Sequence, residues 1–236
     1  MRWLPYTRAP GALQMATDTV LLEGLRRGFS PPTLRFYGWS PPALSLGYHQ
    51  QVDPRWQEVP VVRRPTGGRA VWHADELTYA LTVTNDTQTV TKSYLYLSEF
   101  LLTGAAHLGI QLSYGEAGRG YIHNPSCFGT ATRADLVWRG RKLIGSAQAR
   151  RGGAILQHGS ILLEPDYAKL DTLFGLQSAD RVVGLRAILP ALSVPEVITA
   201  LSAALEKVAG VHLVSGELSA WEQISIAQVD ELCRVH

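Results

Sequence analysis

The segment from residue 134 to residue 163 constrains the fold more than any other part of the chain. Its sequence, ADLVWRGRKLIGSAQARRGGAILQHGSILL, predicts three strands that turn at Arg139-Gly140 and at Gly152-Gly153. Further strands are expected upstream, in the stretches TLRFYGW, ALSLGY, VPVVRR, RAVWH and ELTYALTVT. The middle of the chain is therefore expected to build a sheet.

Helices are expected mainly towards the two ends of the chain. In residues 11–28, apolar side chains including Leu13 recur at helical spacing as far as Gly28, which is expected to end the helix. Further helices are expected over residues 91–110, over residues 195–209 and from about Ser219. Because strands and helices do not alternate regularly, the pattern favours an α+β fold with a mixed, largely antiparallel sheet flanked by helices. We expect one domain over residues 1–236, with a short helical C-terminal part from about residue 190.

Composition and charge narrow the class of protein. With 236 residues, 46% of them hydrophobic and 18% charged, the chain can bury a sizeable core. Its formal net charge of +2 gives no overall field that would attract nucleic acid. The N-terminal stretch lacks the apolar core of a signal peptide, and residues 100–115 are too few and too polar to cross a bilayer. Since two cysteines cannot form a disulfide framework, we expect a cytoplasmic protein with no membrane partner.

A glycine pair surrounded by positive charge marks the stretch VVRRPTGGRAVWHADELTYAL. It contains Arg64, Gly67, Gly68, Arg69 and His73 between two predicted strands. Glycines allow a ligand to approach the backbone closely, and successive backbone N–H groups can bind an anion. The alternative is a hairpin with solvated arginines, which a lone glycine pair favours.

The two cysteines differ in their surroundings. Cys127 lies in the turn-rich stretch IHNPSCFGTATRADL, whereas Cys233 lies on the last helix and is given no role. Most lone cysteines are small buried hydrophobic residues. A loop cysteine close to positive charge would instead have a lowered pKa and be nucleophilic.

Positive charge gathers in sequence around Lys142. Within residues 133–151, Asp135 is the only acidic residue. The basic residues there are Arg133, Arg139, Arg141, Lys142, Arg150 and Arg151. By itself Lys142 is expected to be a solvated lysine at a strand edge. The cluster as a whole is either a solvated face or a patch that attracts an acidic protein or a phosphate.

His158 and Ser160 lie two residues apart on one predicted strand, so their side chains point to the same face. A Ser-His nucleophile pair is conceivable, but polar core groups with satisfied hydrogen bonds are the favoured interpretation. No spacing typical of metal ligands occurs, and no metal site is proposed.

Taken in order, these stretches resemble the lipoate/biotin ligase and octanoyltransferase superfamily. The resemblance rests on LRFYGWSPPALSLGYHQ, RRPTGGRAVWHADELTYAL, CFGTATRADLVWRGRKLIGSAQARRGGAILQHGSILL and GVHLVSGELSAWE, and it extends from about Met15 to the last helix. It implies a mixed sheet flanked by helices, related to the catalytic cores of class II aminoacyl-tRNA synthetases and biotin ligases.

Within the superfamily, the chain is most similar to the cysteine-dependent octanoyltransferases. ATP-dependent lipoate ligases typically have a third glycine where this chain has Arg69, and a Gly-Asn pair where it has Glu76-Leu77. The resemblance implies that Cys127 carries an acyl thioester. It also implies that Lys142, fifteen positions later, lowers the pKa of the cysteine and handles its proton.

The resemblance further implies the substrates and the residues that bind them. The donor would be octanoyl-acyl carrier protein, and the acceptor a lysine on a lipoyl domain of a 2-oxoacid dehydrogenase complex or on the glycine cleavage H protein. The expected substrate-binding residues are Arg64, Gly67, Gly68, Arg69, His73, Gly145, Ser146, Gln148 and His158. No cofactor is expected.

Two alternatives stay open. In the first, the protein is an ATP-dependent lipoate or octanoate ligase that forms an acyl-adenylate, in which Lys142 holds the acyl carbonyl and the phosphate while Cys127 is incidental. In the second, it is a non-catalytic module that binds carrier protein.

Overall fold

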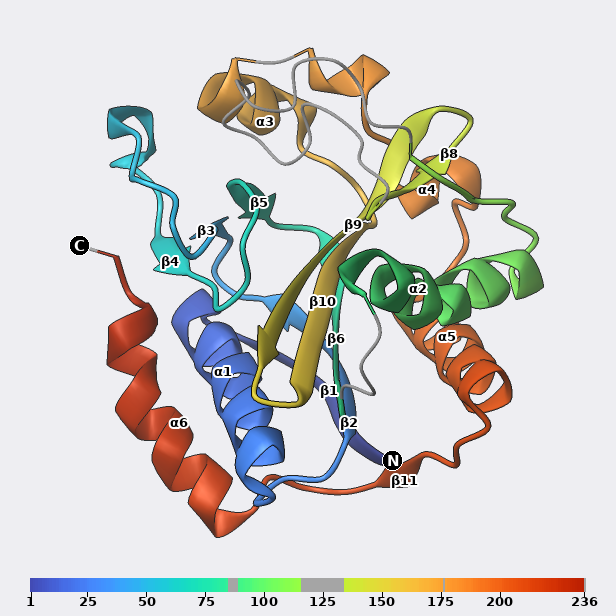
Figure 1. Ribbon diagram of the computed structural model, residues 1–236. Coiled ribbons are helices and arrows are strands. Elements are labelled where there is room, and N and C mark those ends of the chain that lie inside the picture. Colours follow the sequence, from blue (N-terminus) through green and yellow to red (C-terminus); the bar gives the residue numbers. More distant parts are fainter. Residues whose placement is uncertain (85–88, 116–133, 176, 236) are drawn as a thin grey trace.

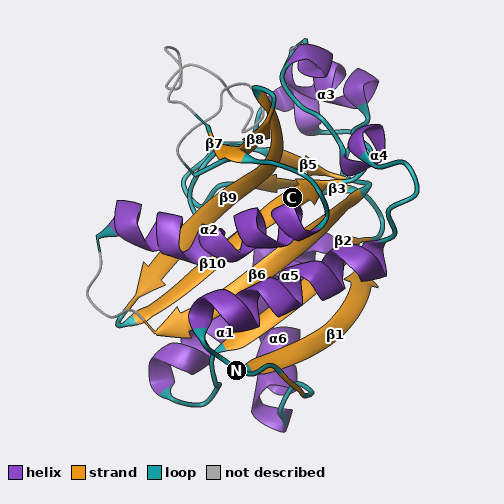
Figure 2. Ribbon diagram, turned by 90° about the vertical axis from the view of Figure 1, so that its right-hand side faces the viewer, coloured by secondary structure: helices purple, strands orange, loops and turns teal. Residues whose placement is uncertain are grey.

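The computed structural model describes residues 1–84, 89–115, 134–175 and 177–235 of the chain (Figure 1). The described residues form three layers, with an eight-stranded sheet between two pairs of helices. Helices α1 (Gly11–Arg27) and α6 (Ala220–Cys233) cover one face of the sheet, and α2 (Val90–His107) and α5 (Val194–Ala209) cover the other (Figures 1 and 2).

The large sheet is mixed, as predicted. Its strands lie in the order β11-β1-β2-β6-β10-β9-β8-β7. Strand β1 pairs in parallel with β2 and β11, and every other neighbouring pair is antiparallel. The strands are β1 Arg2–Ala9, β2 Thr33–Trp39, β6 Glu76–Thr84, β7 Ser113–Tyr114, β8 Leu136–Trp138, β9 Arg141–Arg151, β10 Ala154–Leu162 and β11 Val214–Ser215.

The predicted succession of three strands is confirmed in β8, β9 and β10. Both turns that connect them lie where the glycines predicted them, and Gly140, Gly152 and Gly153 all have positive φ angles. Tight turns that follow the twist of antiparallel strands require this conformation, which glycine adopts without strain.

A smaller, three-stranded sheet lies beside the end of α1 (Figure 1). Its order is β4-β3-β5, with β3 Ala43–Leu46, β4 Val61–Arg63 and β5 Val71–His73. The segment that contains the glycine pair connects β4 to β5. It is therefore a loop of this small sheet and not a part of the large one.

The predicted helices are present, although α2 ends at His107 and not at the expected residue 110. Gly28 caps α1 in the left-handed conformation at φ 79°, and Ser193 and Ser219 each begin a helix with a capping box. The sequence did not predict the short helices α3 Tyr167–Phe174 and α4 Leu185–Ile188, or the single 3-10 turns Pro54–Trp56 and Ser178–Asp180.

Alternation along β2 divides the interior into two apolar layers. Leu34 and Phe36 face α2 and α5, whereas Tyr37 and Trp39 face α1 and α6. Every residue of β2 is buried, so Arg35 is also enclosed on the α1 side and requires a polar partner there.

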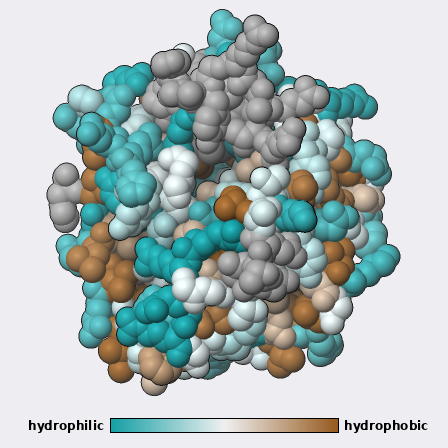
Figure 3. Space-filling model, viewed as in Figure 1, coloured by the Kyte–Doolittle hydropathy of each residue, from teal (hydrophilic) through white to brown (hydrophobic). Residues whose placement is uncertain are grey.

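On the face that Figure 3 shows, hydrophilic side chains cover most of the surface and apolar ones form small separate groups. No helix in the described ranges combines the length and hydropathy of a membrane-spanning segment.

Candidate active site

A cavity of about 40 Å³ lies where α1, the small sheet and strands β2, β9 and β10 meet. Met15, Tyr37 and Trp39 contribute an apolar wall, and the polar side chains come from the small sheet and from β9 and β10. The residues predicted from the sequence that line it are Arg64, His73, Lys142, Gly145, Ser146 and His158. Strands far apart in the sequence thus bring most of the predicted binding residues together.

Arg64 braces the loop that carries the glycine pair. Its guanidinium donates to the backbone carbonyls of Ser45 at 3.0 Å, Gly67 at 2.8 Å and Arg69 at 2.7 Å. The residue is only 5% exposed, so the interpretation as a solvated hairpin arginine is wrong for Arg64. Gly68 has a φ of 91° and packs so closely on Gly47 that a Cβ at Gly47 would lie 1.9 Å from the Gly68 carbonyl oxygen.

His73 joins the same loop to the centre of the large sheet. Its Nδ1 lies 2.7 Å from Glu76 Oε1, and its Nε2 lies 2.7 Å from the Ser45 hydroxyl. With a carboxylate acceptor at Nδ1, that nitrogen carries the proton and Nε2 accepts from Ser45. The Trp39 ring stacks on the imidazole with centroids 3.8 Å apart, so the ring is held on its edges and on one face.

Burial lowers the pKa of His73 below its ordinary value of 6.5. Glu76 acts in the opposite direction, and the charge of Arg64 adds to the lowering. The folded state therefore holds this imidazole neutral, since desolvation penalises its charged form.

We expect the free energy of unfolding to be highest above pH 6.5 and to fall as the pH drops below it. In that range the unfolded chain takes up a proton at His73 that the folded chain resists, so protonation favours unfolding. Urea titrations at about pH 8 and about pH 5.5 measure the difference, and His73→Gln should reduce it. An identical pH dependence in this variant would show that His73 does not contribute.

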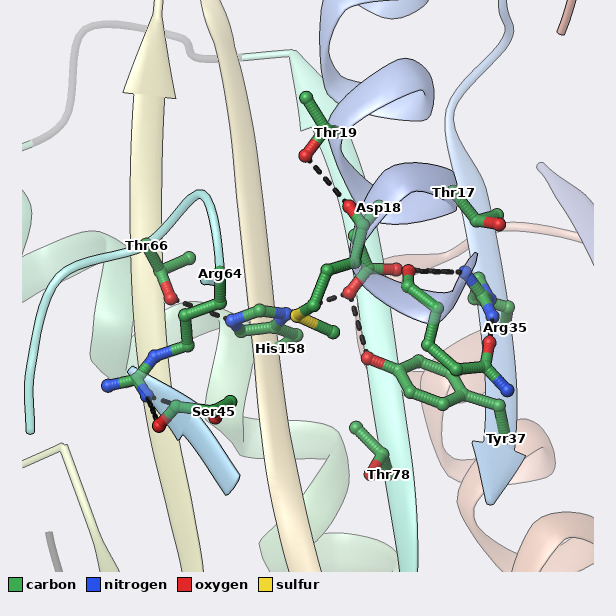
Figure 4. Close-up of polar contacts among 12 residues, drawn as sticks. Thr17, Asp18, Thr19, Arg35, Tyr37, Ser45, Arg64, Thr66, Thr78 and His158 are labelled. Carbon is green, nitrogen blue, oxygen red and sulfur yellow. Dashed lines mark hydrogen bonds and ion pairs between the residues drawn. The ribbon is translucent and has the colours of Figure 1, made fainter. Parts of the chain in front are cut away.

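Asp18 is the centre of a second buried network (Figure 4). Its carboxylate accepts from Tyr37 OH at 2.8 Å and from Arg35 at 3.1 Å, and it lies 2.8 Å from His158 Nδ1. On the other side of the ring, His158 Nε2 lies 2.7 Å from the Thr66 hydroxyl. A buried charge on α1 is therefore connected through β10 to the loop with the glycine pair.

The sequence contained a signal for this network that our prediction missed. Asp18 stands among the buried residues of α1, and Arg35 stands between buried apolar neighbours on β2. Charged residues are almost never fully buried unless they are paired. Two opposite charges that each break an apolar pattern therefore indicate a buried pair.

Thr66→Val should lower the free energy of unfolding by about 1–2 kcal/mol, because it leaves His158 Nε2 buried without a donor. Thr66 is fully buried and valine has nearly the same shape, so packing should change little. Urea unfolding measures the loss, and Thr66→Ser, which keeps the hydroxyl, is the matched control. Equal stability of the valine variant and the wild type would contradict a stabilising role for this bond.

Lys142 is enclosed in the cavity wall. Its Nζ lies 2.8 Å from Asp135 Oδ1, and the two side chains are 2% and 3% exposed. A Cβ at Gly145 would lie 2.7 Å from Lys142 Cε, so glycine provides the space for the lysine stem. The interpretation of Lys142 as a solvated lysine at a strand edge is wrong.

The lipoyl protein ligase A/B catalytic domain model matches residues 10–206 of the chain. The chain belongs to this family. It is 41% identical over 191 residues to the octanoyltransferase LipM of Geobacillus kaustophilus, covering 73% of this chain and 69% of that protein. It is 37% identical to the octanoyltransferase LipM of Kyrpidia tusciae, covering 97% and 94% of the two chains.

The fold of the family is confirmed by a solved structure. A crystal structure of lipoate-protein ligase A bound with ATP superposes with a TM-score of 0.85, covering 98% of this chain and 93% of that one. The two sequences are 22% identical, so this likeness concerns the fold alone. The predicted lipoate-ligase architecture, with its mixed and largely antiparallel sheet, is therefore correct.

The remaining predicted site residues occupy several positions relative to the cavity. Ser146 lines it and its hydroxyl lies 2.8 Å from that of Tyr79. The Gln148 side chain instead bonds to Gln157 on β10 at 2.6 Å and to Ser93 on α2 at 3.1 Å. Gly67, Gly68 and Arg69 lie in the loop that Arg64 braces, and Cys127 lies outside the described residues.

Ser160 and His158 both line the cavity, as their shared face predicted, but they do not form a nucleophile pair. The Ser160 hydroxyl donates to Glu76, whereas His158 bonds to Asp18 and Thr66. The favoured interpretation as satisfied polar core groups is confirmed. In the portion of the chain that the structure describes, no group of three or more His, Cys, Asp and Glu residues could hold a metal ion.

The cluster of basic residues around Lys142 is not one surface patch. Arg141 and Arg151 are the two ends of β9. At a rise of about 3.3 Å per residue, they lie roughly 30 Å apart. Among the described residues, Arg150 and Arg151 are therefore far from the β8–β9 turn, and the basic residues of this segment do not form one compact patch.

Proposed function

We propose that the chain is an octanoyltransferase of lipoate biosynthesis. It takes an octanoyl group from acyl carrier protein onto Cys127 and passes it to a lysine of a lipoyl domain. The observation that carries this proposal is the identity of about 40% to curated octanoyltransferases, which for the Kyrpidia tusciae protein extends over 97% of this chain.

The proposed reaction has two half-reactions. In the first, the Cys127 thiolate attacks the carbonyl carbon of the donor thioester, a new C–S bond forms, the bond to the carrier's sulfur breaks, and the carrier leaves as its thiolate. In the second, the acceptor amine attacks the octanoyl carbonyl, a C–N bond forms, and the bond to Cys127 breaks to regenerate its thiolate. The proton that the amine loses is taken up, directly or through solvent, by the released carrier thiolate, which becomes a thiol. A covalent intermediate divides one difficult exchange into two easier steps.

In this proposal Lys142 supports both half-reactions. Its ammonium group lies in the wall of the cavity beside Gly145, held by Asp135 at 2.8 Å. A fixed positive charge there favours the thiolate and the oxyanion that develops on the attacked carbonyl. Because Asp135 fixes the ammonium in advance, no reorganisation is needed when the negative charge appears.

The ligase alternative is less compatible with the network around His73. Ligases of the superfamily typically have glycine at the position of Glu76, and glycine cannot supply the carboxylate that bonds to His73 here. In this chain Glu76 also accepts from Thr78 at 2.6 Å and from Ser160. We therefore infer that this cavity is built for acyl transfer without ATP.

One experiment separates the functions. The protein is incubated with octanoyl-acyl carrier protein in the absence of ATP, and its intact mass is recorded. An octanoyl adduct that a lipoyl domain then removes supports the transferase. Modification of the lipoyl domain that needs ATP and free octanoate supports the ligase, and no change under either condition supports a non-catalytic binding module.

A further inference from the structure

The tip of the β8–β9 hairpin has an unusual backbone conformation for its sequence. Its turn consists of Arg139 and Gly140, with φ angles of 49° and 77°. In the described part of the chain, Arg139 is the only non-glycine residue with a positive φ. Asparagine, aspartate or glycine normally occupies such a position, because a longer side chain is disfavoured there. An arginine at this position therefore indicates a role for its side chain.

The side chain of Arg139 is organised by its neighbours. Its guanidinium lies 4.4 Å from the centre of the Trp138 ring, and the guanidinium of Arg141 lies 6.0 Å from the same ring. Arg139 is exposed and Arg141 is partly exposed. Within the described ranges neither side chain forms an ion pair, although Arg141 makes one long bond of 3.4 Å to the carbonyl of Ala179. We name Trp138, Arg139 and Arg141 the Arg-Trp ridge.

The ridge lies close to the proposed active site. Lys142, in the cavity wall, directly follows Arg141 on β9, and only Arg141 separates it from the Arg139-Gly140 turn. The hairpin projects at the same end of the sheet as α3 and β5 (Figures 1 and 2). A protein that delivers a group to the cavity can therefore contact the ridge at the same time.

We propose that the Arg-Trp ridge is the docking surface for the acidic carrier protein that delivers the acyl group. This inference rests on the proposed function. Guanidinium groups bind carboxylates with two parallel hydrogen bonds, which suits the acidic side chains of such a partner. The contact of 4.4 Å with the Trp138 ring orients the Arg139 guanidinium before the partner arrives, so less side-chain freedom is lost on binding.

The conformation of Arg139 allows a substitution that separates docking from folding. Arg139→Asn removes the charge but places at the turn a residue that prefers its backbone conformation, so the melting temperature should stay the same or rise. The matched control is Arg151→Gln, which removes one positive charge at the far end of β9. Binding of holo-acyl carrier protein is measured by titration without turnover, at low and at high salt, and transfer is measured with octanoyl-acyl carrier protein and with the neutral donor octanoyl-pantetheine.

Arg139→Asn should weaken binding of the carrier about threefold to fivefold, the range for an exposed ion pair, and should reduce its salt dependence. The double variant Arg139→Asn/Arg141→Gln should weaken binding further. Both ridge variants should transfer octanoyl from octanoyl-pantetheine at the wild-type rate. Arg151→Gln should bind the carrier as tightly as the wild type does. A wild type that binds the carrier through the ridge but transfers nothing would refute the proposed function and leave the docking surface intact.

Several results would overturn the inference. Unchanged carrier binding in the double variant would show that the ridge is not the docking surface. An equal loss of carrier binding in Arg151→Gln would show that only overall charge matters. An equal loss of transfer from both donors in the ridge variants would show that the ridge serves folding or the chemical step. A fall in the melting temperature of Arg139→Asn would show that the arginine serves the turn itself, and absence of measurable binding by the wild type would also refute the inference.

Discussion

Cys127→Ala should eliminate the octanoyl adduct and reduce transfer by on the order of 10⁴-fold or more, the scale on which loss of a nucleophile acts. The alanine side chain cannot form the thioester, so the first half-reaction has no acceptor. Cys127→Ser should also be nearly inactive, because a hydroxyl is far harder to ionise than a thiol. Intact-mass spectrometry after exposure to octanoyl-acyl carrier protein measures the adduct, and transfer to a lipoyl domain measures the whole reaction.

The second cysteine provides the control. Cys233 is buried at the end of α6, and burial raises the pKa of its thiol to about 11. Such a thiol contains very little thiolate at neutral pH and should not react with a thioester. Cys233→Ala should therefore form the adduct at the wild-type rate. Full transfer by Cys127→Ala would instead exclude the thioester mechanism and favour the ligase.

Elements that repeat a local pattern could be predicted from the sequence. Alternating residues identified β6, and paired glycines identified the turn between β9 and β10, because each signal lies within a few neighbouring residues. Strand β1 has no such signal. Of its residues only Leu4 is buried, Pro5 interrupts it, and it forms by pairing with two distant strands. The apolar pattern was also wrong at Leu13, which is 38% exposed although it lies on α1.

In the candidate site, too, local features could be predicted and long-range contacts could not. The types of its residues were predicted, but their partners were not, because those partners are distant in the sequence. His158 and Asp18 are 140 positions apart, and Ser160 and Glu76 are 84 apart. Such pairs follow from the requirement that buried polar groups be hydrogen-bonded, and that requirement applies only once the fold is known. The sequence alone could have identified the charged residues that interrupt apolar patterns, but it could not have shown which of them pair with one another.

The Lys142–Asp135 pair shows why partners matter for testing a mechanism. Lys142→Ala would remove the proposed catalytic ammonium, but it would also break the buried ion pair with Asp135. Breaking a buried ion pair in this way costs about 3–5 kcal/mol. The single variant should therefore lose both transfer and stability, and its inactivity alone would not distinguish catalysis from folding.

A paired substitution resolves the two roles of Lys142. In Lys142→Gln/Asp135→Asn no unpaired charge remains and the amides can still bond, so most of the free energy of unfolding lost in Lys142→Ala should return. Transfer should not return, because no ammonium is left to favour the thiolate of Cys127. Alkylation of Cys127 near neutral pH should remain slow in the double variant and recover as the pH rises, because hydroxide then supplies the thiolate without help from the lysine. Urea unfolding, alkylation and transfer are measured on the same preparations. If transfer and alkylation return together with stability, Lys142 serves the fold, and the proposed pairing of Lys142 with Cys127 is wrong.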